Sequence, residues 1–175
     1  MKIFLGLILF CNFIFAVDAT MEIVKNNSSK SQIVLFKSLQ SANDKFSSKV
    51  LEVSCNFSIS ESTQNVQFGE FPVSATNQGN LALVVNVATI GEKIALQIKL
   101  YDTNSQKLVL DNTISPTTHV KYPFLSHKAA ILVNNYLGAP SIDWMNKFVV
   151  FSRYLNAKQS EVVVADYTLT FQTSV

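Results

Sequence analysis

The segment from residue 81 to residue 114 constrains the fold more than any other part of this chain, because strand and turn patterns alternate along it. Leu81 to Val87 is an almost unbroken apolar run, which is typical of an interior strand. Gly91-Glu92 has glycine at the first central position of a two-residue turn, which favours a type II′ hairpin. Residues 94–101 then alternate between two faces, and Leu108 to Ile114 predicts a third strand. We therefore predict a three-stranded meander with one apolar face that another element must cover.

A first helix is predicted upstream of this meander, after a strand at Ile33 to Phe36. Asn43 or Asp44 provides its N-cap. Apolar residues then recur at spacings of four, three and four, which places them on one face of the helix. These residues are Phe46, Val50, Val53 and Phe57. The following residues, 58–79, are rich in polar side chains and suggest only a short helix around Pro72 to Gln78.

A second helix is predicted after the meander. Pro123 suits a first helical turn, and Gly138 and Pro140 end the helix. Its apolar stripe consists of Tyr122, Leu125, Ala129, Leu132 and Tyr136. The element order is strand, helix, three strands, helix. Two helices that cover one mixed sheet are the simplest arrangement, so the predicted fold class is α/β of the α+β two-layer type.

The last 30 or so residues differ from the rest, because they contain strand patterns and no helix. Lys147 to Arg153 and Glu161 to Tyr167 predict two strands joined by a polar turn at Leu155 to Ser160. Thr168 to Thr173 predicts a further strand. A lone hairpin is marginally stable in water, so we expect this segment to belong to a larger structure.

The first nineteen residues have the layout of a secretory signal peptide. Lys2 supplies the positive charge, and an apolar run follows from Ile3 to Phe15. This run is shorter than the roughly 20 apolar residues that a membrane-spanning helix needs. Ala16 and Ala19 offer small residues for cleavage, and cleavage after Ala19 is favoured. We therefore expect a protein exported through a cleaved signal peptide.

Charge and cysteine content exclude several classes of protein. The net charge is +2, only 15% of residues are charged, and the lysines are scattered, so no dense basic face for nucleic acid is predicted. Removal of residues 1–19 leaves Cys55 as the sole cysteine, and an intramolecular disulfide is then impossible. We interpret Cys55 as a small buried residue.

No catalytic pattern is found in the sequence. His119 and His127 have no second ligand at a metal-binding spacing, and we interpret His127 as a structural histidine of the second helix. Asp102 and Asp111 flank the third strand of the meander without the cleft that a pair of catalytic carboxylates needs. We therefore expect no enzyme activity, no cofactor, no metal and no small-molecule substrate.

Several short segments, taken in order, resemble one family of bacterial envelope proteins. They are Gly79 to Val85, Leu100 to Thr103, His127 to Ala130 followed by Leu137-Gly138, Lys147 to Ser152, and Glu161 to Tyr167; upstream, Leu51, Ser54 and Phe57 fit the end of the first helix. In their order and spacing these segments are similar to the TolB family of the Tol–Pal system. The resemblance covers nearly the whole chain after the signal and is strongest from Gly79 to Tyr167.

The resemblance implies a periplasmic subunit of a system that links the inner and outer membranes and supports envelope constriction at cell division. In this family the mature amino-terminal segment binds TolA, and a carboxy-terminal six-bladed propeller binds the lipoprotein Pal. The small domain between them is a sheet with two helices, similar to the anticodon-binding fold. By this resemblance, residues 1–19 are the signal peptide and residues 20–143 the amino-terminal α/β domain. Residues 144–175 would be the first strands of an incomplete β-propeller blade.

The sequence also departs from the family pattern. Thr168-Leu169 stands where the family continues with Asp-Gly, Cys55 stands near the position of a helix-ending glycine in many members, and Asn86 replaces another glycine. The chain stops after the strands that would open the first blade, so we expect a truncated TolB in which binding to Pal is doubtful. A shortened but working variant fits the same observations.

The candidate site for TolA is the segment Thr20, Met21, Glu22, Ile23, Val24 and Lys25. Such a segment could dock by strand addition, or it could form an edge strand of the protein's own sheet. An alternative function is a stand-alone envelope adaptor or assembly protein with the same small fold. In that case Lys147 to Val175 would pair with the protein's own sheet or with a second copy.

Overall fold

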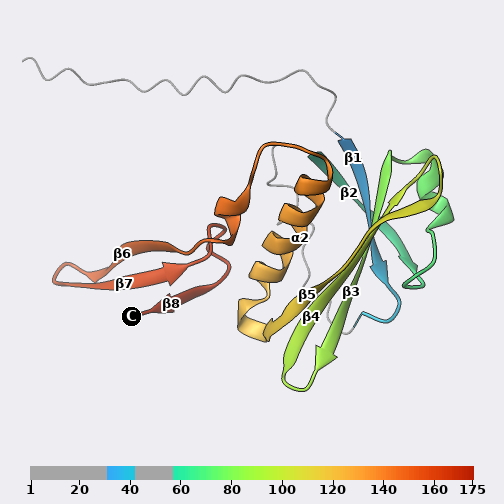
Figure 1. Ribbon diagram of the computed structural model, residues 1–175. Helices are drawn as coiled ribbons and strands as arrows, with labels where there is room; N and C mark the ends of the chain where they lie inside the picture. The colour runs from blue at the N-terminus through green and yellow to red at the C-terminus, as the bar shows by residue number, and fades with distance from the viewer. Residues whose placement is uncertain (1–30, 42–56) are drawn as a thin grey trace, which may run out of the picture.

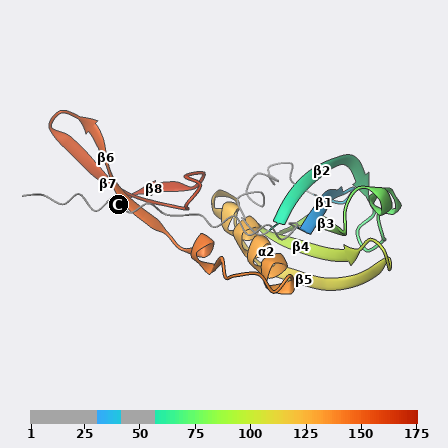
Figure 2. The same ribbon diagram turned by 90° about the horizontal axis from the view of Figure 1, so that it is seen from above.

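The computed structural model describes residues 31–41 and 57–175. A twisted five-stranded sheet packs against one face of the long helix α2, and a smaller three-stranded sheet lies on the other side of that helix (Figure 1). The view from above shows the same succession of sheet, helix and sheet (Figure 2). α2 is therefore the element that connects the two sheets in space.

The larger sheet combines parallel and antiparallel pairing. Its strands are β1 (Ser31–Ser38), β2 (Phe57–Val66), β3 (Leu81–Ile90), β4 (Lys93–Asp102) and β5 (Lys107–Thr118), in the order β2-β1-β3-β4-β5. β1 is parallel to both of its neighbours, with Ile33 opposite Ile59 on one side and opposite Leu81 on the other. β3, β4 and β5 form an antiparallel meander. The predicted interior strand at Leu81 to Val87 is thus confirmed, and so is the meander.

The turn between β3 and β4 has the predicted form. Gly91 has a φ of +60°, whereas Glu92 is not among the residues with positive φ. A type II′ turn requires positive φ at its first central position alone, which glycine adopts at no steric cost. Ile90 and Lys93 face each other directly across this turn, so the register of the hairpin is set by two residues.

The main core lies between the five-stranded sheet and α2, which spans Pro123–Tyr136. Alternate residues of β4 point into it and are at most 2% exposed: Ile94, Leu96, Ile98 and Leu100. α2 contributes Leu125, Ala129 and Val133 to the same core. Full burial of each of the larger aliphatic side chains contributes about 1.5–3 kcal/mol, so this layer stabilises the sheet on one face.

A smaller core covers the opposite face of the sheet. Val34, Phe36 and Tyr101 point to this side and pack against Phe68 and Phe71. The last two belong to the connection between β2 and β3, which also contains the 3₁₀ helix η1 (Val73–Asn77). The short helix predicted around Pro72 to Gln78 is therefore present as a 3₁₀ turn. The connection covers apolar surface that would otherwise be exposed.

Both ends of α2 follow from the sequence. Pro123 occupies the first helical position, where no backbone N–H is needed. At the other end Gly138 adopts a φ of +63°. Its N–H donates to the carbonyl of Asn135 and the N–H of Ala139 donates to the carbonyl of Asn134, which together form a Schellman motif. The predicted second helix and its glycine stop are confirmed.

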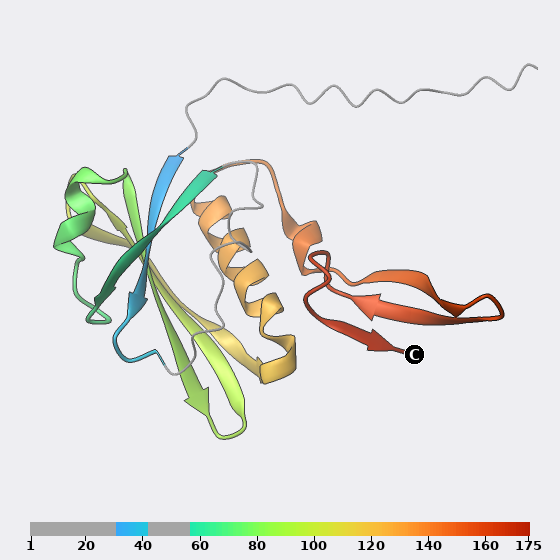
Figure 3. The same ribbon diagram turned by 180° about the vertical axis from the view of Figure 1, so that it is seen from behind.

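The smaller sheet begins after the 3₁₀ helix η3 (Asp143–Asn146). Its strands are β6 (Val149–Asn156), β7 (Gln159–Ala165) and β8 (Gln172–Ser174), all antiparallel and in sequence order. In the described parts of the chain no strand of this sheet pairs with the larger one, and the view from behind shows it extending away from α2 (Figure 3). The predicted polar turn at Leu155 to Ser160 is shorter than expected, because β6 and β7 continue to Asn156 and Gln159.

Two expectations about the first half of the chain need correction. Phe57, predicted as the last apolar residue of the first helix, opens β2, and β2 occupies much of the polar stretch for which no strand was predicted. The polar sequence of β2 has no apolar pattern that predicts a strand. The strand is stabilised by its parallel backbone pairing with β1. The rest of the first predicted helix and the strand expected at residues 21–25 lie outside the described residues. The described residues therefore contain one α-helix, not the two that were expected.

Candidate interaction surface at the junction of the two sheets

Part of the sequence-predicted site lies outside the described residues. Thr20 to Lys25, the candidate segment for TolA, falls in this part of the chain, and so does Cys55. The described residues instead show how the two sheets are joined through α2 and which face of the smaller sheet is exposed to solvent.

The junction is built on a second side of α2 that the predicted apolar stripe did not include. Ser126, His127 and Ala130 are fully buried there, whereas Tyr136, predicted to be in the stripe, is 44% exposed. A helix that packs against a sheet on each side needs small or apolar residues on more than one face. The buried face of α2 is therefore wider than the single stripe that covers the larger sheet.

Aromatic rings fill the space between α2 and the smaller sheet. The ring centroid of Phe124 lies 5.0 Å from that of Phe148 and 5.7 Å from that of Phe171. The ring of Tyr167 meets that of His127 edge to face at 4.7 Å, and the ring of Trp144 at 5.1 Å. Such pairs contribute about 0.5–1.5 kcal/mol each beyond the area that they bury. They come from α2, η3, the residue before β6 and the β7–β8 loop, so they fix the smaller sheet against the helix.

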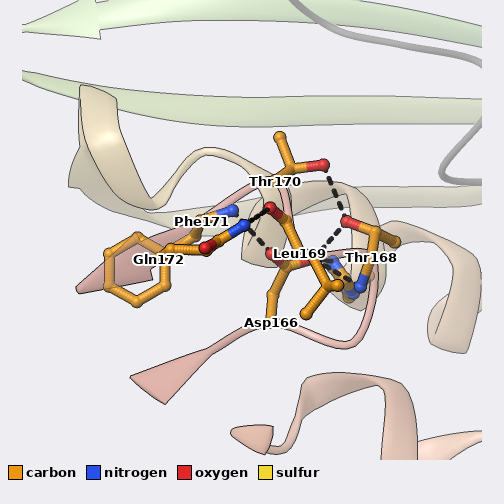
Figure 4. A network of polar contacts seen from close by, with 7 residues as sticks. Asp166, Thr168, Leu169, Thr170, Phe171 and Gln172 are labelled. Atoms are coloured by element: carbon orange, nitrogen blue, oxygen red, sulfur yellow. Dashed lines mark hydrogen bonds and ion pairs between the residues drawn. The ribbon is translucent and has the colours of Figure 1, made fainter. Parts of the chain in front are cut away.

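The loop between β7 and β8 is organised around the carboxylate of Asp166 (Figure 4). Asp166 is fully buried and accepts hydrogen bonds from the backbone N–H of Phe171 at 2.6 Å and of Thr168 at 3.0 Å. The hydroxyl of Thr168 donates to the same carboxylate and also contacts the hydroxyl of Thr170 at 2.8 Å. Leu169 adopts a φ of +59° at the tip of this loop. The carboxylate thus satisfies backbone donors that burial has removed from water.

His127 adds an ionisable group to this buried network. Its Nε2 lies 3.3 Å from Oδ2 of Asp166, and both side chains are fully buried. Burial lowers the pKa of His127 to about 4, although the charge of Asp166 acts in the opposite direction. The neutral imidazole is therefore the stable form at neutral pH. His127 is buried as a structural histidine would be, but among the described residues neither of its ring nitrogens has a hydrogen-bond partner. Burial, and secondly Asp166, also raise the pKa of Tyr167 to about 12.

One face of the smaller sheet exposes several apolar side chains, with Ser152 and Ser160 among them. Val150 pairs with Val164, and Tyr154 is two alternations further along β6, so these side chains share a face with Val162 of β7. Val150 is 62% exposed, Tyr154 83% and Val162 48%. Contiguous exposed apolar side chains on a soluble protein commonly mark a surface that contacts another chain. We call Val150, Tyr154, Val162 and Val164 the outer face of the smaller sheet.

The opposite face of the same sheet carries a polar cluster. The guanidinium of Arg153 donates to Glu161 at 2.6 Å and to Gln172 at 3.3 Å, which links all three strands. A hydrogen bond from Ser174, and secondly one from Arg153, lower the pKa of Glu161. This cluster links β6, β7 and β8, and further along the same face of β7 the side chains of Val163 and Ala165 are fully buried.

The other titratable residues considered in the sequence analysis have separate surroundings. Asp102 accepts hydrogen bonds from the N–H and hydroxyl of Ser105 and shapes the β4–β5 turn, whereas Asp111 forms an ion pair with Lys99. His119 lies in the exposed 3₁₀ helix η2 (His119–Lys121). In residues 31–41 and 57–175 no group of three or more His, Cys, Asp or Glu side chains is placed to hold a metal ion. None of the helices in those residues has the length and apolar character needed to cross a membrane.

Sequence reasoning missed Asp166, Phe124, Phe148 and Phe171 as a group. Asp166 followed by Thr168 carries a recognisable signal, because an aspartate that accepts from the backbone two residues later is typical of an Asx turn. The aromatic residues give no comparable signal. They are separated in sequence and only packing brings them together.

The curated proteins to which this chain is similar belong to one family. No protein-family model matches the chain. The chain is 37% identical over 185 aligned residues to the Tol-Pal system protein TolB of Wolinella succinogenes, an alignment that covers 100% of this chain and 44% of that protein. It is 34% identical to the Tol-Pal system protein TolB of Helicobacter hepaticus, with 98% of this chain and 43% of that protein covered. The chain thus spans less than half the length of these curated relatives.

The fold agrees with a solved structure of the same family. The crystal structure of TolB from Acinetobacter baumannii superposes with a TM-score of 0.57 over 83% of this chain and 38% of that chain, at 12% sequence identity. At this identity the superposition establishes the fold, and the family follows from the sequence relatives. Over the part that it spans, this chain is a homologue of the Tol-Pal system proteins named TolB.

Proposed function

We propose that this chain acts as a non-enzymatic, periplasmic, protein-binding component of a Tol–Pal envelope complex, which supports outer-membrane integrity and envelope constriction at cell division. The observation that carries the proposal is the similarity to Tol-Pal system proteins along the whole chain. The exposed outer face of the smaller sheet fits a protein whose role is to contact other chains.

Binding to TolA is assigned to Thr20 to Lys25. This assignment rests on the resemblance to the TolB family, in which the mature amino-terminal segment contacts TolA. Only five residues separate Lys25 from Ser31, where β1 begins. A strand of six residues gains affinity from backbone hydrogen bonds, and its alternate side chains provide selectivity.

The test is a deletion of residues 20–25 from the exported protein. We expect the deletion to abolish binding to purified TolA in isothermal titration calorimetry, while circular dichroism and the unfolding midpoint remain unchanged. A matched control deletes residues 26–30 instead, which shortens the chain without removing the segment. Unchanged TolA binding after deletion of residues 20–25 would disprove the assignment.

Binding to Pal by this chain alone is expected to be weak or absent. The resemblance places Pal binding on a carboxy-terminal propeller, and the chain spans only about two fifths of its relatives. Titration of Pal under the conditions used for TolA tests this expectation. Tight binding would show that Pal recognises another part of the protein.

We also propose a signal peptide, domain boundaries and a second helix for this chain. Residues 1–19 act as the cleaved signal, residues 20–143 as the amino-terminal domain with a second helix that is capped by Asn43 or Asp44, and residues 144–175 as the opening strands of a propeller blade. The two-helix sheet would then resemble the anticodon-binding fold. Intact mass of the protein recovered from the periplasm tests the cleavage, with the mass that begins at Thr20 as the expected result.

A stand-alone envelope adaptor is the less favoured alternative. In an adaptor, residues 147–175 would pair with the larger sheet or with a second copy of the chain. In the described residues, β6 to β8 pair only among themselves. Size-exclusion chromatography separates the two functions. A stable dimer that is lost when Val150 and Val162 are replaced by Thr would favour the adaptor.

A further inference from the structure

The edge strand β5 lies beside a cavity that is unrelated to the aromatic junction. In the described parts of the chain β5 pairs only with β4, so its other edge presents backbone N–H and C=O groups that no strand satisfies. A cavity of about 500 Å³ lies along this edge, between β5, α2 and the residues of η3. α2 runs close to β5 in both views (Figures 1 and 2). A free strand edge and a hollow therefore occur at the same place.

The wall of the cavity on the helix side combines two aliphatic side chains with that of Lys128. Ile131 and Leu132 of α2 line it, and on the strand side Ile114 faces the helix because it pairs with the core residue Leu96. Asn112 lies on the same face of β5, two residues earlier. Side chains along a strand alternate between two faces with a period of two. Every second side chain of a strand added beside β5 would thus lie over Ile131 and Leu132.

The charges around the cavity define the ligand further. Lys128 and Lys147 line it together with Asp143, which leaves an excess of one positive charge. Within residues 31–41 and 57–175 none of these three side chains forms an ion pair within 4.0 Å. A carboxylate placed between the two lysines would form charge-assisted hydrogen bonds, whereas a cationic side chain would be repelled.

The usable edge has a defined end. Pro116 has no backbone N–H, and prolines on an edge strand prevent further pairing. Strand addition is therefore restricted to the part of β5 before Pro116, which contains Asn112 and Ile114. This is the part of β5 that lines the cavity.

We propose that β5, α2 and η3 form a docking site for an extended, acidic segment of a partner protein. The segment adds to β5 as a further strand, places aliphatic side chains over Ile131 and Leu132, and directs a carboxylate to Lys128 and Lys147. This inference goes beyond the proposed function, because it uses neither residues 20–25 nor the outer face of the smaller sheet. The site recognises backbone and charge together, as edge-strand peptide sites do.

The experiment uses a fluorescein-labelled heptapeptide of alternating valine and glutamate and the exported protein from Thr20 to Val175. Fluorescence anisotropy is expected to show saturable binding with a dissociation constant below about 1 mM. A peptide with lysine in place of glutamate should not bind. A valine–glutamate peptide that is N-methylated at alternate residues tests strand addition, because it retains the charges and loses backbone donors.

Charge exchange at the two lysines provides the decisive variant. Lys128→Glu combined with Lys147→Glu should weaken binding of the glutamate peptide at least tenfold, about the loss expected for one charge-assisted hydrogen bond. The same variant should bind the lysine peptide, which also demonstrates that it is folded. Lys158→Glu, in the exposed turn between β6 and β7, is the matched control and should leave binding unchanged.

Three results would overturn the proposal. Equal binding of the N-methylated peptide would show attraction by charge without strand addition. Equal binding by the charge-exchanged protein would place the site elsewhere. Tighter peptide binding after deletion of residues 20–25 would show that the chain's own segment is the natural occupant. Unchanged peptide binding after that deletion would support the site at β5. The effect of the same deletion on TolA binding tests the proposed function separately.

Discussion

His127 and Asp166 lie side by side at the junction between α2 and the smaller sheet, with Nε2 3.3 Å from Oδ2 and neither side chain exposed. They come from elements that are 39 positions apart in sequence. Asp166 holds the β7–β8 loop, and His127 belongs to the helix that covers the larger sheet. The contact therefore connects the stability of one sheet to that of the other.

Replacement of Asp166 should loosen the smaller sheet first. In Asp166→Ala the backbone N–H groups of Phe171 and Thr168 lose their acceptor; the N–H of Phe171 is buried, and an unsatisfied buried donor costs about 1–3 kcal/mol, whereas that of Thr168 is half-buried and costs less. We expect the free energy of unfolding to fall by about 3 kcal/mol, and faster hydrogen exchange at the amide of Phe171. Asp166→Asn retains one acceptor oxygen and should show a smaller loss. Unaltered exchange at Phe171 in the alanine variant would contradict the role given to Asp166.

His127 should make the protein less stable in acid. Its pKa is about 4 in the folded protein and ordinarily 6.5, so between these values the unfolded chain binds a proton that the folded protein does not. The stability of the protein with a neutral His127 is fully present above pH 6.5. The free energy of unfolding then falls by about 2–3 kcal/mol as the pH decreases towards 4. Urea unfolding of the wild type and of His127→Leu at pH 7 and pH 4.5 measures it. An equal loss of stability in both proteins would assign the pH dependence to other groups.

Thr103 should stabilise the larger sheet through its hydroxyl. Its Oγ donates to the carbonyl of Gly79 at 2.6 Å, and the side chain is 1% exposed. Thr103→Val keeps the shape and leaves this carbonyl without that donor, at a cost of about 1–2 kcal/mol. Thr103→Ser keeps the hydroxyl and is the matched control. The measurement is the urea unfolding midpoint, and equal losses in the two variants would show that shape matters more than the hydrogen bond.

Gly138 should be needed for its backbone conformation and not for space. Its φ is +63°, and a Cβ at this position would meet no atom within 4 Å. Gly138→Ala should therefore cost about 1 kcal/mol, which is the penalty for a left-handed conformation in a residue with a side chain. Gly138→Asn should cost less, because asparagine tolerates this region better. Thermal unfolding of the two variants checks the order, and an alanine variant as stable as the wild type would contradict it.

Much of the fold was predictable because its signals are local. The strict alternation at residues 94–101, glycine at position 91 and the proline and glycine at the ends of α2 all act over a few residues. Each pattern predicted its element, and the bounds shifted by only a few positions. β2 was missed because its sequence, Phe57–Val66, is mostly polar and acquires its strand conformation by pairing with β1.

The candidate site was less predictable because it depends on contacts between distant segments. The sequence by itself determined the meander, the hairpin turn and α2, since the period of apolar side chains and the turn residues act within each element. Only the tertiary structure decided that α2 packs on two sides, that His127 meets Asp166, and that the edge of β5 adjoins a cavity. The physical reason is that burial and pairing depend on which surfaces meet, and residues such as Phe124 and Phe171 become neighbours only when the sheets close around the helix.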